Sequence, residues 1–478
     1  MNVDMDPGRR PRRRHLQLVA VGLAAATALA LAGCGDSDEG AAGGQASAGG
    51  TDIGDGKVLW ESSSVDSDYP SQLTVKAEAD PQIPTKEVKL VQAPFNDHSY
   101  GSIGIAKGWF KESGITVKPE PNGTILVMDQ VAPALLSGQV DVGSMASSVW
   151  LSALDQTTKN KMFTYADVFI GHAILGNPKS GYKTFKEFQD EGMSFDEAMK
   201  AALTQLKGKS YAYPSETSQR PFQNYVFGKA GMKLSDAKGV VVDDPKVVEL
   251  ATAGRVEAAS PTGGPNVVQL LKLGWKPIVS KQELIASGEG ADLEGTLLSS
   301  GWAATDDWLA ENHDTALRLA SLMYRIIDLK KDQPEEAAKI QIPFLNSIAG
   351  TNFTTEDAVQ LDTLVDPFFT FEEQEDFFVN KESPWYYRKG GEGTIADAEK
   401  SGVLKPGHDM DEIILADDTW RELRSLKEAS DKLIETVKAG NPSGKAQQYL
   451  DQAQAYSDAR DYLDALRFAG AAELAAGS

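Results

Sequence analysis

Four short segments of this sequence carry the side chains best suited to hold a small molecule. The sequence pattern places each segment just after a buried strand, and three of them have Ser or Thr beside a helix start. Backbone N–H groups and hydroxyls at converging helix starts can bind an anion or a carbonyl oxygen, and aromatic rings can exclude water around it. The predicted chemistry is therefore binding. The segments cover residues 95–100, 143–147, 214–220 and 260–264.

Twelve residues in these segments, or in the strand expected over 297–304, are the candidate ligand contacts. Arg220 is the only lysine or arginine of the four segments and could pair with an anionic ligand. Each has an alternative: Arg220 as a solvated residue of a first helical turn, the Ser and Thr residues as simple N-caps, and the aromatic residues as core. The candidates are Phe95, His98, Tyr100, Ser144, Met145, Ser215, Thr217, Ser218, Arg220, Thr262, Gly263 and Trp302.

The sequence offers little for catalysis or for a metal. A hydrolase of the nucleophile-elbow class needs a G-x-S-x-G motif in a strand–turn–helix setting, and the chain has none. Zinc sites need several histidines close together, and the histidines beyond position 34 are widely spaced. We therefore expect no enzyme activity, no cofactor and no metal site. These histidines are His98, His172, His313 and His408.

Two stretches that resemble each other predict the elements that position these residues. Residues 134–144 and 250–260 each read as the last turn of an apolar-faced helix, a glycine and a short buried strand. Gly138 and Gly254 stand where a left-handed helix C-cap favours glycine. Two such units predict an α/β chain of two lobes, whose strand-end loops face each other across a cleft.

The surroundings of the first unit resemble a known family. A strand over 88–95 is followed by a helix, by Gly108-Trp109-Phe110, and by Gly114 before a second strand at 115–117. Together with residues 134–143, this pattern resembles the solute-binding proteins of ABC importers for nitrate, sulfonates, taurine and thiamine-pyrimidine precursors. The resemblance covers roughly residues 88–310. Two positions depart from the family pattern: Gly104 replaces the usual Ala, and Glu257 the usual Asp.

The resemblance implies a type II periplasmic-binding-protein fold, a small ligand between the lobes, and permease and ATPase partners. A lipid-anchored solute sensor for a partner receptor is one alternative. The other is an enzyme related to pyrimidine synthases, which use a Lys and a run of Cys that this chain lacks. Arg220 and the Ser- and Thr-rich helix starts favour an oxyanion-bearing ligand such as a sulfonate, taurine or nitrate.

The start of the sequence predicts export and lipid anchoring. Five arginines precede an apolar stretch over 16–32, and Leu31-Ala32-Gly33-Cys34 is similar to the lipobox of bacterial lipoproteins. Cys34, the only cysteine, would be acylated, which excludes an intramolecular disulfide. The alternative is a simple membrane anchor with a buried cysteine. We expect an extracytoplasmic protein held at the cell membrane by lipid.

Composition and charge limit the possible partners, and the sequence pattern divides the chain into segments. With 47 basic and 69 acidic residues, a net charge of −22 argues against nucleic acid as a partner. Apolar positions from Trp420 onward predict an amphipathic helical face that packs on the body, with partner binding as the alternative. The expected segments are a lipoprotein signal peptide (1–33), a flexible tether (34–56), lobe 1 with an N-terminal extension (57–177), lobe 2 (178–285), the lobe 1 return with a helical segment (286–404) and a C-terminal helical extension (405–478).

Overall fold

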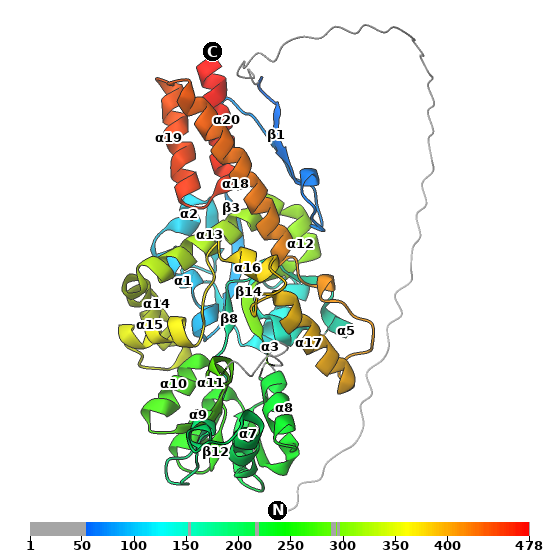
Figure 1. The fold of residues 1–478 in the computed structure, drawn as a ribbon. Helices are drawn as coiled ribbons and strands as arrows, with labels where there is room; N and C mark the ends of the chain where they lie inside the picture. Colours follow the sequence, from blue (N-terminus) through cyan, green and yellow to red (C-terminus); the bar gives the residue numbers. More distant parts are fainter. Residues whose placement is uncertain (1–53, 152–153, 216–218, 288–292, 294–296, 478) are drawn as a thin grey trace, which may run out of the picture. The chain divides into compact units, whose positions relative to one another are not determined.

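Two mixed β-sheets lie at the centres of two lobes (Figure 1). The computed structural model describes residues 54–151, 154–215, 219–287, 293 and 297–477, and every structural statement below concerns these residues. They all belong to one unit that spans Thr51–Ser478. No helix within them has the length and apolar character needed to cross a membrane.

Lobe 1 contains the seven-stranded sheet, in the order β4-β3-β6-β14-β7, with β5 beside β3 and β8 beside β14. The strand β3 runs parallel to β4, β5 and β6, whereas β14 runs antiparallel to β6, β7 and β8. The strands are β3 (Lys86–Gln92), β4 (Ile115–Lys118), β5 (Thr124–Ile125), β6 (Val142–Ala146), β7 (Asn160–Met162), β8 (Asp167–Phe169) and β14 (Leu298–Thr305).

Short helices follow the strands of lobe 1, and longer helices follow β14. The helices are η2 (Asn96–His98), α1 (Gly101–Ala106), α2 (Trp109–Glu112), α3 (Met128–Leu136), α4 (Ser147–Leu151), α5 (Leu154–Thr157), α12 (Asp306–Glu311), α13 (His313–Asp332), α14 (Pro334–Ala349) and α15 (Thr355–Leu364). Leucines near helical spacing over 306–329 would suggest one long helix, but the structure has two, α12 and α13. The helix breaks at Asn312, whose φ is −134° and whose side chain donates 2.8 Å to the Trp308 carbonyl.

Lobe 2 contains the five-stranded sheet, in the order β11-β10-β12-β9-β13. Successive residues of β10 point to opposite faces of the sheet and so pack in different cores. Tyr211 packs with α6, α7 and α8, and Ala212 packs with α9 and α10. The elements are β9 (Ala173–Gly176), β10 (Ser210–Pro214), β11 (Lys238–Val242), β12 (Ala258–Ala259), β13 (Lys276–Ser280), α6 (Phe185–Asp190), α7 (Phe195–Thr204), α8 (Arg220–Lys229), η3 (Leu234–Asp236), α9 (Asp244–Thr252), α10 (Gly264–Lys272) and α11 (Lys281–Ala286).

The two repeated units occupy equivalent places in the two lobes. Gly138 lies between α3 and β6 with φ of 69°, and Gly254 lies between α9 and β12 with φ of 66°. Both are left-handed, as glycine permits. The expected two-lobe α/β fold is confirmed. The chain enters lobe 2 between β8 and β9 and returns between α11 and β14.

The C-terminal helices pack on lobe 1 and on the N-terminal extension. Leu423 and Leu426 of α18 are buried in the lobe 1 core, and Arg318 of α13 forms a buried ion pair with Asp464 of α20. In the extension, the Trp60 indole donates 2.9 Å to Ser425. The elements are β1 (Val58–Glu61), η1 (Ser62–Ser64), β2 (Thr74–Lys76), α16 (Gln374–Phe378), α17 (Tyr387–Lys400), η5 (Met410–Glu412), α18 (Ala416–Ala439), α19 (Lys445–Asp458) and α20 (Tyr462–Gly477).

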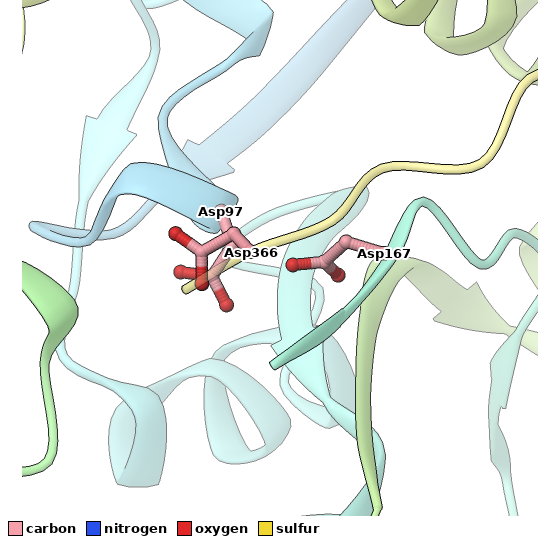
Figure 2. A group of neighbouring side chains, drawn as sticks. All are labelled: Asp97, Asp167 and Asp366. Atoms are coloured by element: carbon pink, nitrogen blue, oxygen red, sulfur yellow. The ribbon is translucent and has the colours of Figure 1, made fainter. Parts of the chain in front are cut away.

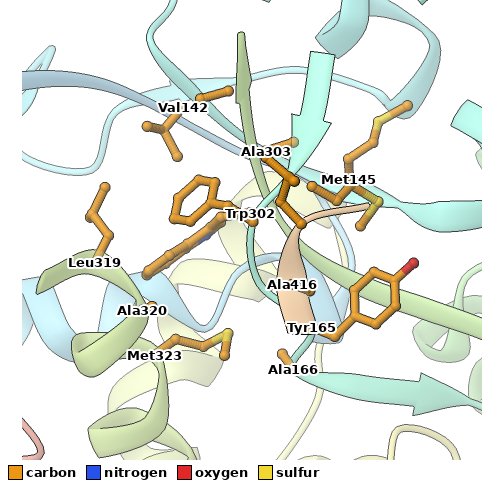
Figure 3. Packing of buried hydrophobic residues seen from close by; sticks show 14 of the residues in the cluster. Val142, Met145, Tyr165, Ala166, Trp302, Ala303, Leu319, Ala320, Met323 and Ala416 are labelled. Carbon is orange, nitrogen blue, oxygen red and sulfur yellow. The ribbon is translucent and has the colours of Figure 1, made fainter. Parts of the chain in front are cut away.

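Trp302 lies at the centre of the lobe 1 core, between the sheet and α13. Figure 3 shows its indole beside α13, near Leu319, Ala320 and Met323. The side chain is 1% exposed. This packing fixes β14, the strand that sets the position of the polar residues described next.

Candidate functional site

Three aspartates converge where lobe 1 meets lobe 2. Asp97 lies in η2 just after β3, Asp167 begins β8, and Asp366 follows α15. Figure 2 shows the three carboxylates directed toward one another from three separate segments. One carboxylate oxygen from each lies within 4.8 Å of the others, and all three residues are buried. So dense a group of buried acids is rare unless its charge is balanced.

Hydrogen bonds to neighbouring residues hold these carboxylates in place. Ser300 of β14 donates its hydroxyl to Asp167 and to the Asp97 carbonyl, the latter at 3.1 Å. The Ser300 amide also donates to Asp167, at 3.0 Å. The Asn96 amide nitrogen donates 2.9 Å to Asp366 and 2.8 Å to Asp362. The cluster is therefore built into the backbone of lobe 1.

The charge of the three carboxylates is not balanced by ion pairs with lysine or arginine among the described residues. Lys330, a buried base whose charge acts on Asp97 and Asp167, pairs with Asp362 at 2.9 Å and donates to Gln341 at 2.7 Å. The His98 Nε2 lies 3.2 Å from Asp97, but burial lowers the pKa of His98 to about 3, so the ring is neutral. Burial, followed by neighbouring carboxylates, raises the pKa of Asp167 and Asp366 far above the usual range.

Several oxygens of the carboxylates and of the residues beside them lack a hydrogen-bond partner within the described part of the chain. They include Oδ2 of Asp167, Oδ1 of Asp366, Oδ1 of Asn96 and the Tyr100 hydroxyl. The Asn96 and Tyr100 side chains are fully buried. Buried polar groups in folded proteins almost always have partners, so these oxygens mark a place where a further partner is expected.

Residues next to the three aspartates make the contacts with lobe 2. Ring atoms of Phe95 lie against Gly263, and side-chain atoms of Val365 and Phe169 lie against Gly264, at the start of α10. Each of these three residues is within two positions of one of the aspartates. The cluster therefore lies on the lobe 1 side of the lobe–lobe contact.

The loop before α10 is already occupied by a carboxylate of this chain. Asp244 accepts from the Thr262 amide at 2.7 Å and from the Gly263 amide at 3.3 Å. The donors that the sequence analysis assigned to an oxyanion in this loop are therefore engaged with Asp244. The Thr262 hydroxyl is buried and has no partner among the described residues.

The predicted ligand contacts from lobe 1 lie beside the three aspartates or in the lobe 1 core. His98 Nδ1 is 2.8 Å from the Ser144 hydroxyl, so these two candidates contact each other. Tyr100 stacks on Trp302 with ring centroids 5.4 Å apart, and Trp302 itself is core. Phe95 is half-buried at the contact with lobe 2.

Arg220 does not lie at the aspartate cluster. It lines a separate cavity of about 410 Å³ between α8, α3, α4 and α17. Its guanidinium stacks on Tyr213 at 4.5 Å and reaches the Pro214 carbonyl at 3.5 Å. Met145, a further candidate, lines the same cavity, as does Asp397. Ser215 is exposed. Thr217, Ser218 and the expected lipidation site Cys34 lie outside the described residues.

Sequence reasoning missed Asp167, Asp366 and Asn96 as site residues. Asp366 lies in no recognisable sequence motif, and the residues around it are notable only for being acidic and aromatic. Asp167 did carry a signal, because it is a charged residue inside the apolar run 165–170. A charge in a predicted buried strand marks a position where a partner must be sought.

Comparisons with known proteins agree with this architecture. No family model matches the chain. Putative binding proteins of Brucella abortus and Brucella suis are 24% identical over 212 residues, which are 40% of this chain and 62% of theirs, so the match spans less than two thirds of their length.

Similar solved structures include one from Bordetella bronchiseptica RB50, with a TM-score of 0.50, 17% identity, and 72% of this chain and 99% of that chain covered. At this identity, the likeness shows the fold. The periplasmic aliphatic sulphonate binding protein SsuA of Escherichia coli has a TM-score of 0.49, 15% identity, and 70% and 99% coverage. The periplasmic nitrate-binding protein NrtA of Synechocystis has a TM-score of 0.48, 14% identity, and 71% and 88% coverage.

Proposed function

We propose that this chain is the solute-binding component of an ABC importer, which captures a small ligand between its lobes and delivers it to a membrane permease. The observation that carries the proposal is the partly unsatisfied polar cluster at the lobe contact, formed by Asp97, Asp167, Asp366, Asn96 and Tyr100. Atoms that lack partners in a buried, preformed place are what a ligand would satisfy. Closure of two lobes on a ligand is a common hinge motion.

Binding rather than turnover fits the side chains at the lobe contact. The hydroxyl of Ser144 and the ring of His98 do pair, at 2.8 Å, which a nucleophile and its base would also do. The other ring nitrogen of His98 lies 3.2 Å from Asp97, as in a catalytic triad. However, Ser144 is 0% exposed and His98 is buried, so a substrate does not reach the hydroxyl in this arrangement. A desulfurization enzyme is among the similar structures, with a TM-score of 0.47. Turnover of a sulfonate or sulfinate by the purified protein would contradict the binding proposal.

The resemblance proposes sulfonates, taurine or nitrate as ligands, and Arg220 would be the counter-charge. The cavity of about 410 Å³ that Arg220 lines has room for a small organic anion. The test is thermal unfolding of the full chain across sulfonates, taurine, nitrate, thiamine precursors, amino acids and sugars. A ligand at one hundred times its Kd adds about 2.7 kcal/mol of stability. If no compound raises Tm, capture of these ligand classes fails, and the solute sensor for a partner receptor is favoured over their import.

Lipid anchoring through Cys34 completes the proposal. The resemblance to solute-binding proteins and the expected lipobox support an extracytoplasmic protein on the membrane. Mass spectrometry of the protein from the membrane fraction should find an acylated N-terminal cysteine. Cys34→Ala should release the protein from that fraction. An unmodified Cys34 in the membrane-bound protein would contradict anchoring by lipid.

A further inference from the structure

The carboxylate oxygens of Asp97, Asp167 and Asp366 are spaced as the ligands of one cation. Ligands on opposite sides of an ion lie at most twice the bond length apart, about 5 Å for Ca²⁺, whose bonds measure about 2.3–2.6 Å. The three oxygens lie within 4.8 Å of one another. They are hard oxygen donors, which Ca²⁺, Mg²⁺ and Mn²⁺ prefer over the softer ligands chosen by zinc or copper.

The balance of charge also calls for a cation at this place. Lys330 neutralises Asp362, and no described lysine or arginine forms an ion pair with the other three carboxylates. Burying a charge without a partner is costly, so the cluster must be discharged by protons or by a bound cation.

Two neighbouring groups that are not carboxylates favour the cation over protons. The Asn96 side chain contacts Asp366 through its nitrogen, and its Oδ1 has no donor within the described chain. The Tyr100 hydroxyl is also fully buried and without a partner, and the nearby charges of Asp167 and Asp97 act on it. A proton shared among carboxylates would leave the Asn96 oxygen unsatisfied. An ion and its bound water can satisfy every one of these oxygens.

The position of the cluster connects ion binding to the contact between the lobes. Phe95, Phe169 and Val365 touch the start of α10, and each lies within two positions of a cluster aspartate. The Lys272 ammonium of α10 also pairs with Asp357 of α15 at 2.5 Å. Drawing the three carboxylates together would therefore set the surface on which lobe 2 closes.

We propose that Asp97, Asp167 and Asp366 bind a divalent metal ion with oxygen ligands at the lobe contact, so that the captured solute is the ion or a complex of it. This inference rests on the proposed function, because it assigns the ligand class of the same site. It differs from the oxyanion expectation, whose donors in the α10 loop are held by Asp244.

The test is calorimetric titration of the full chain with Ca²⁺, Mn²⁺ and Mg²⁺ at pH 7, after EDTA treatment and removal of the chelator. We expect saturable binding of at least one ion at a single site. Asp366→Asn and Asp167→Asn should each weaken it tenfold or more, while circular dichroism shows a folded protein. Asp461→Asn, which removes a buried carboxyl just before α20, should leave the affinity unchanged.

Mn²⁺ gives a direct second readout. Its electron paramagnetic resonance signal should broaden on wild-type protein and recover when Ca²⁺ competes. Equal loss of affinity in Asp366→Asn and Asp461→Asn would overturn the proposal, because it would show that removing a buried carboxyl remote from the cluster weakens binding as much as removing one of the three ligands. The proposal would also be overturned if titration with a diamine such as putrescine gave a heat of binding while titration with the metal ions gave none.

The failure of this inference is separable from the failure of the import proposal. A sulfonate or nitrate that raises Tm in the presence of EDTA, while no ion binds, would overturn the metal site and support solute capture. Ion binding that Asp366→Asn abolishes would support the metal site. If deletion of the cognate permease then left uptake of that ion unchanged, the import proposal alone would fail.

Discussion

The ring of Phe95 in lobe 1 lies directly against the backbone of Gly263 in lobe 2. A Cβ atom on Gly263 would lie 2.8 Å from Cδ1 and 2.9 Å from Cε1 of Phe95, closer than carbon atoms can approach. The φ at Gly263 is −72°, so a larger residue meets no backbone strain. The absence of a side chain here permits the contact between the lobes, and it makes that contact open to a clean test.

Gly263→Ala should therefore hold the lobes apart. Overpacking of this kind costs about 1–3 kcal/mol, which corresponds to a loss of about 5- to 150-fold in the affinity of a ligand that binds the closed form. Small-angle scattering should show a larger radius of gyration than in the wild type. The double variant Gly263→Ala/Phe95→Ala should be more compact than Gly263→Ala alone. Equal radii in wild type and Gly263→Ala would contradict this account.

The backbone of β14 approaches another segment more closely still. A Cβ on Gly301 would lie 1.8 Å from the Thr164 carbonyl oxygen, and backbone cannot move aside as a flexible side chain can. We expect Gly301→Ala to lower the free energy of unfolding by about 3 kcal/mol or more. Urea unfolding followed by circular dichroism measures the change.

Gly228 in α8 provides the matched control. It is exposed, and a Cβ there would meet no atom within 4 Å. Gly228→Ala should raise the free energy of unfolding by about 0.5–1 kcal/mol, because alanine loses less conformational entropy in a helix. If the two substitutions changed stability alike, the close approach at Gly301 would not be the cause.

The sequence predicted those features that depend on local backbone geometry. The left-handed conformations of Gly138 and Gly254 follow from the residue type and from the end of an apolar helical face. The strands β3, β6 and β14 follow from runs of buried residue types. The capping boxes of Thr184 with Glu187 and Ser194 with Glu197 were not among the predictions, although Ser or Thr three residues before Glu is a local signal for them.

The polar site depends on contacts that no local pattern encodes. Asp167 and Asp366 are far apart in the chain, and the path of α13, α14 and α15 brings them together. The direction of Arg220 likewise depends on Tyr213 and on the helices around its cavity. The occupation of the α10 loop by Asp244 could not be foreseen, because Asp244 belongs to a different helix.

The buried ion pair between Arg318 and Asp464 should be a main stabilising contact between lobe 1 and the C-terminal helices. Arg318 Nε lies 2.7 Å from Oδ2, and its terminal nitrogen lies 3.0 Å from Oδ1, so the pair is bidentate. Removing one partner of a buried pair costs about 3–5 kcal/mol when the other charge is left uncompensated, and Asp464 would keep only Arg467, at 3.0 Å, as a partner. Arg318→Met should therefore lower the free energy of unfolding by up to that amount in urea.

Arg424 supplies the comparison for Arg318. It is exposed in α18 and lies 3.6 Å from Glu375 and 3.7 Å from Glu428. Exposed pairs contribute little, so Arg424→Met should change stability by less than about 1 kcal/mol. A similar loss in both variants would show that the arginine stems, rather than the buried charge pair, stabilise the packing.

Asp461 predicts how stability should depend on pH. Burial, followed by the charge of Asp464, raises the pKa of Asp461 to about 8 in the folded protein, whereas an unfolded aspartate titrates near about 4. Between these values the folded state binds the additional proton, so this group's contribution to stability falls as pH rises from about 4 to about 8. Asp461→Asn cannot ionise, and its amide oxygen can still accept from the Asp464 amide, as Asp461 does at 3.2 Å.

The free energy of unfolding of Asp461→Asn, relative to wild type, should therefore rise steadily between pH 5 and pH 8. Urea unfolding at several pH values measures this difference. Asp458→Asn, at an exposed position of α19, serves as the control and should show a constant difference over the same range. A constant difference for Asp461→Asn as well would mean that Asp461 is ionised in the folded protein, and that Arg318 balances both carboxylates rather than Asp464 alone.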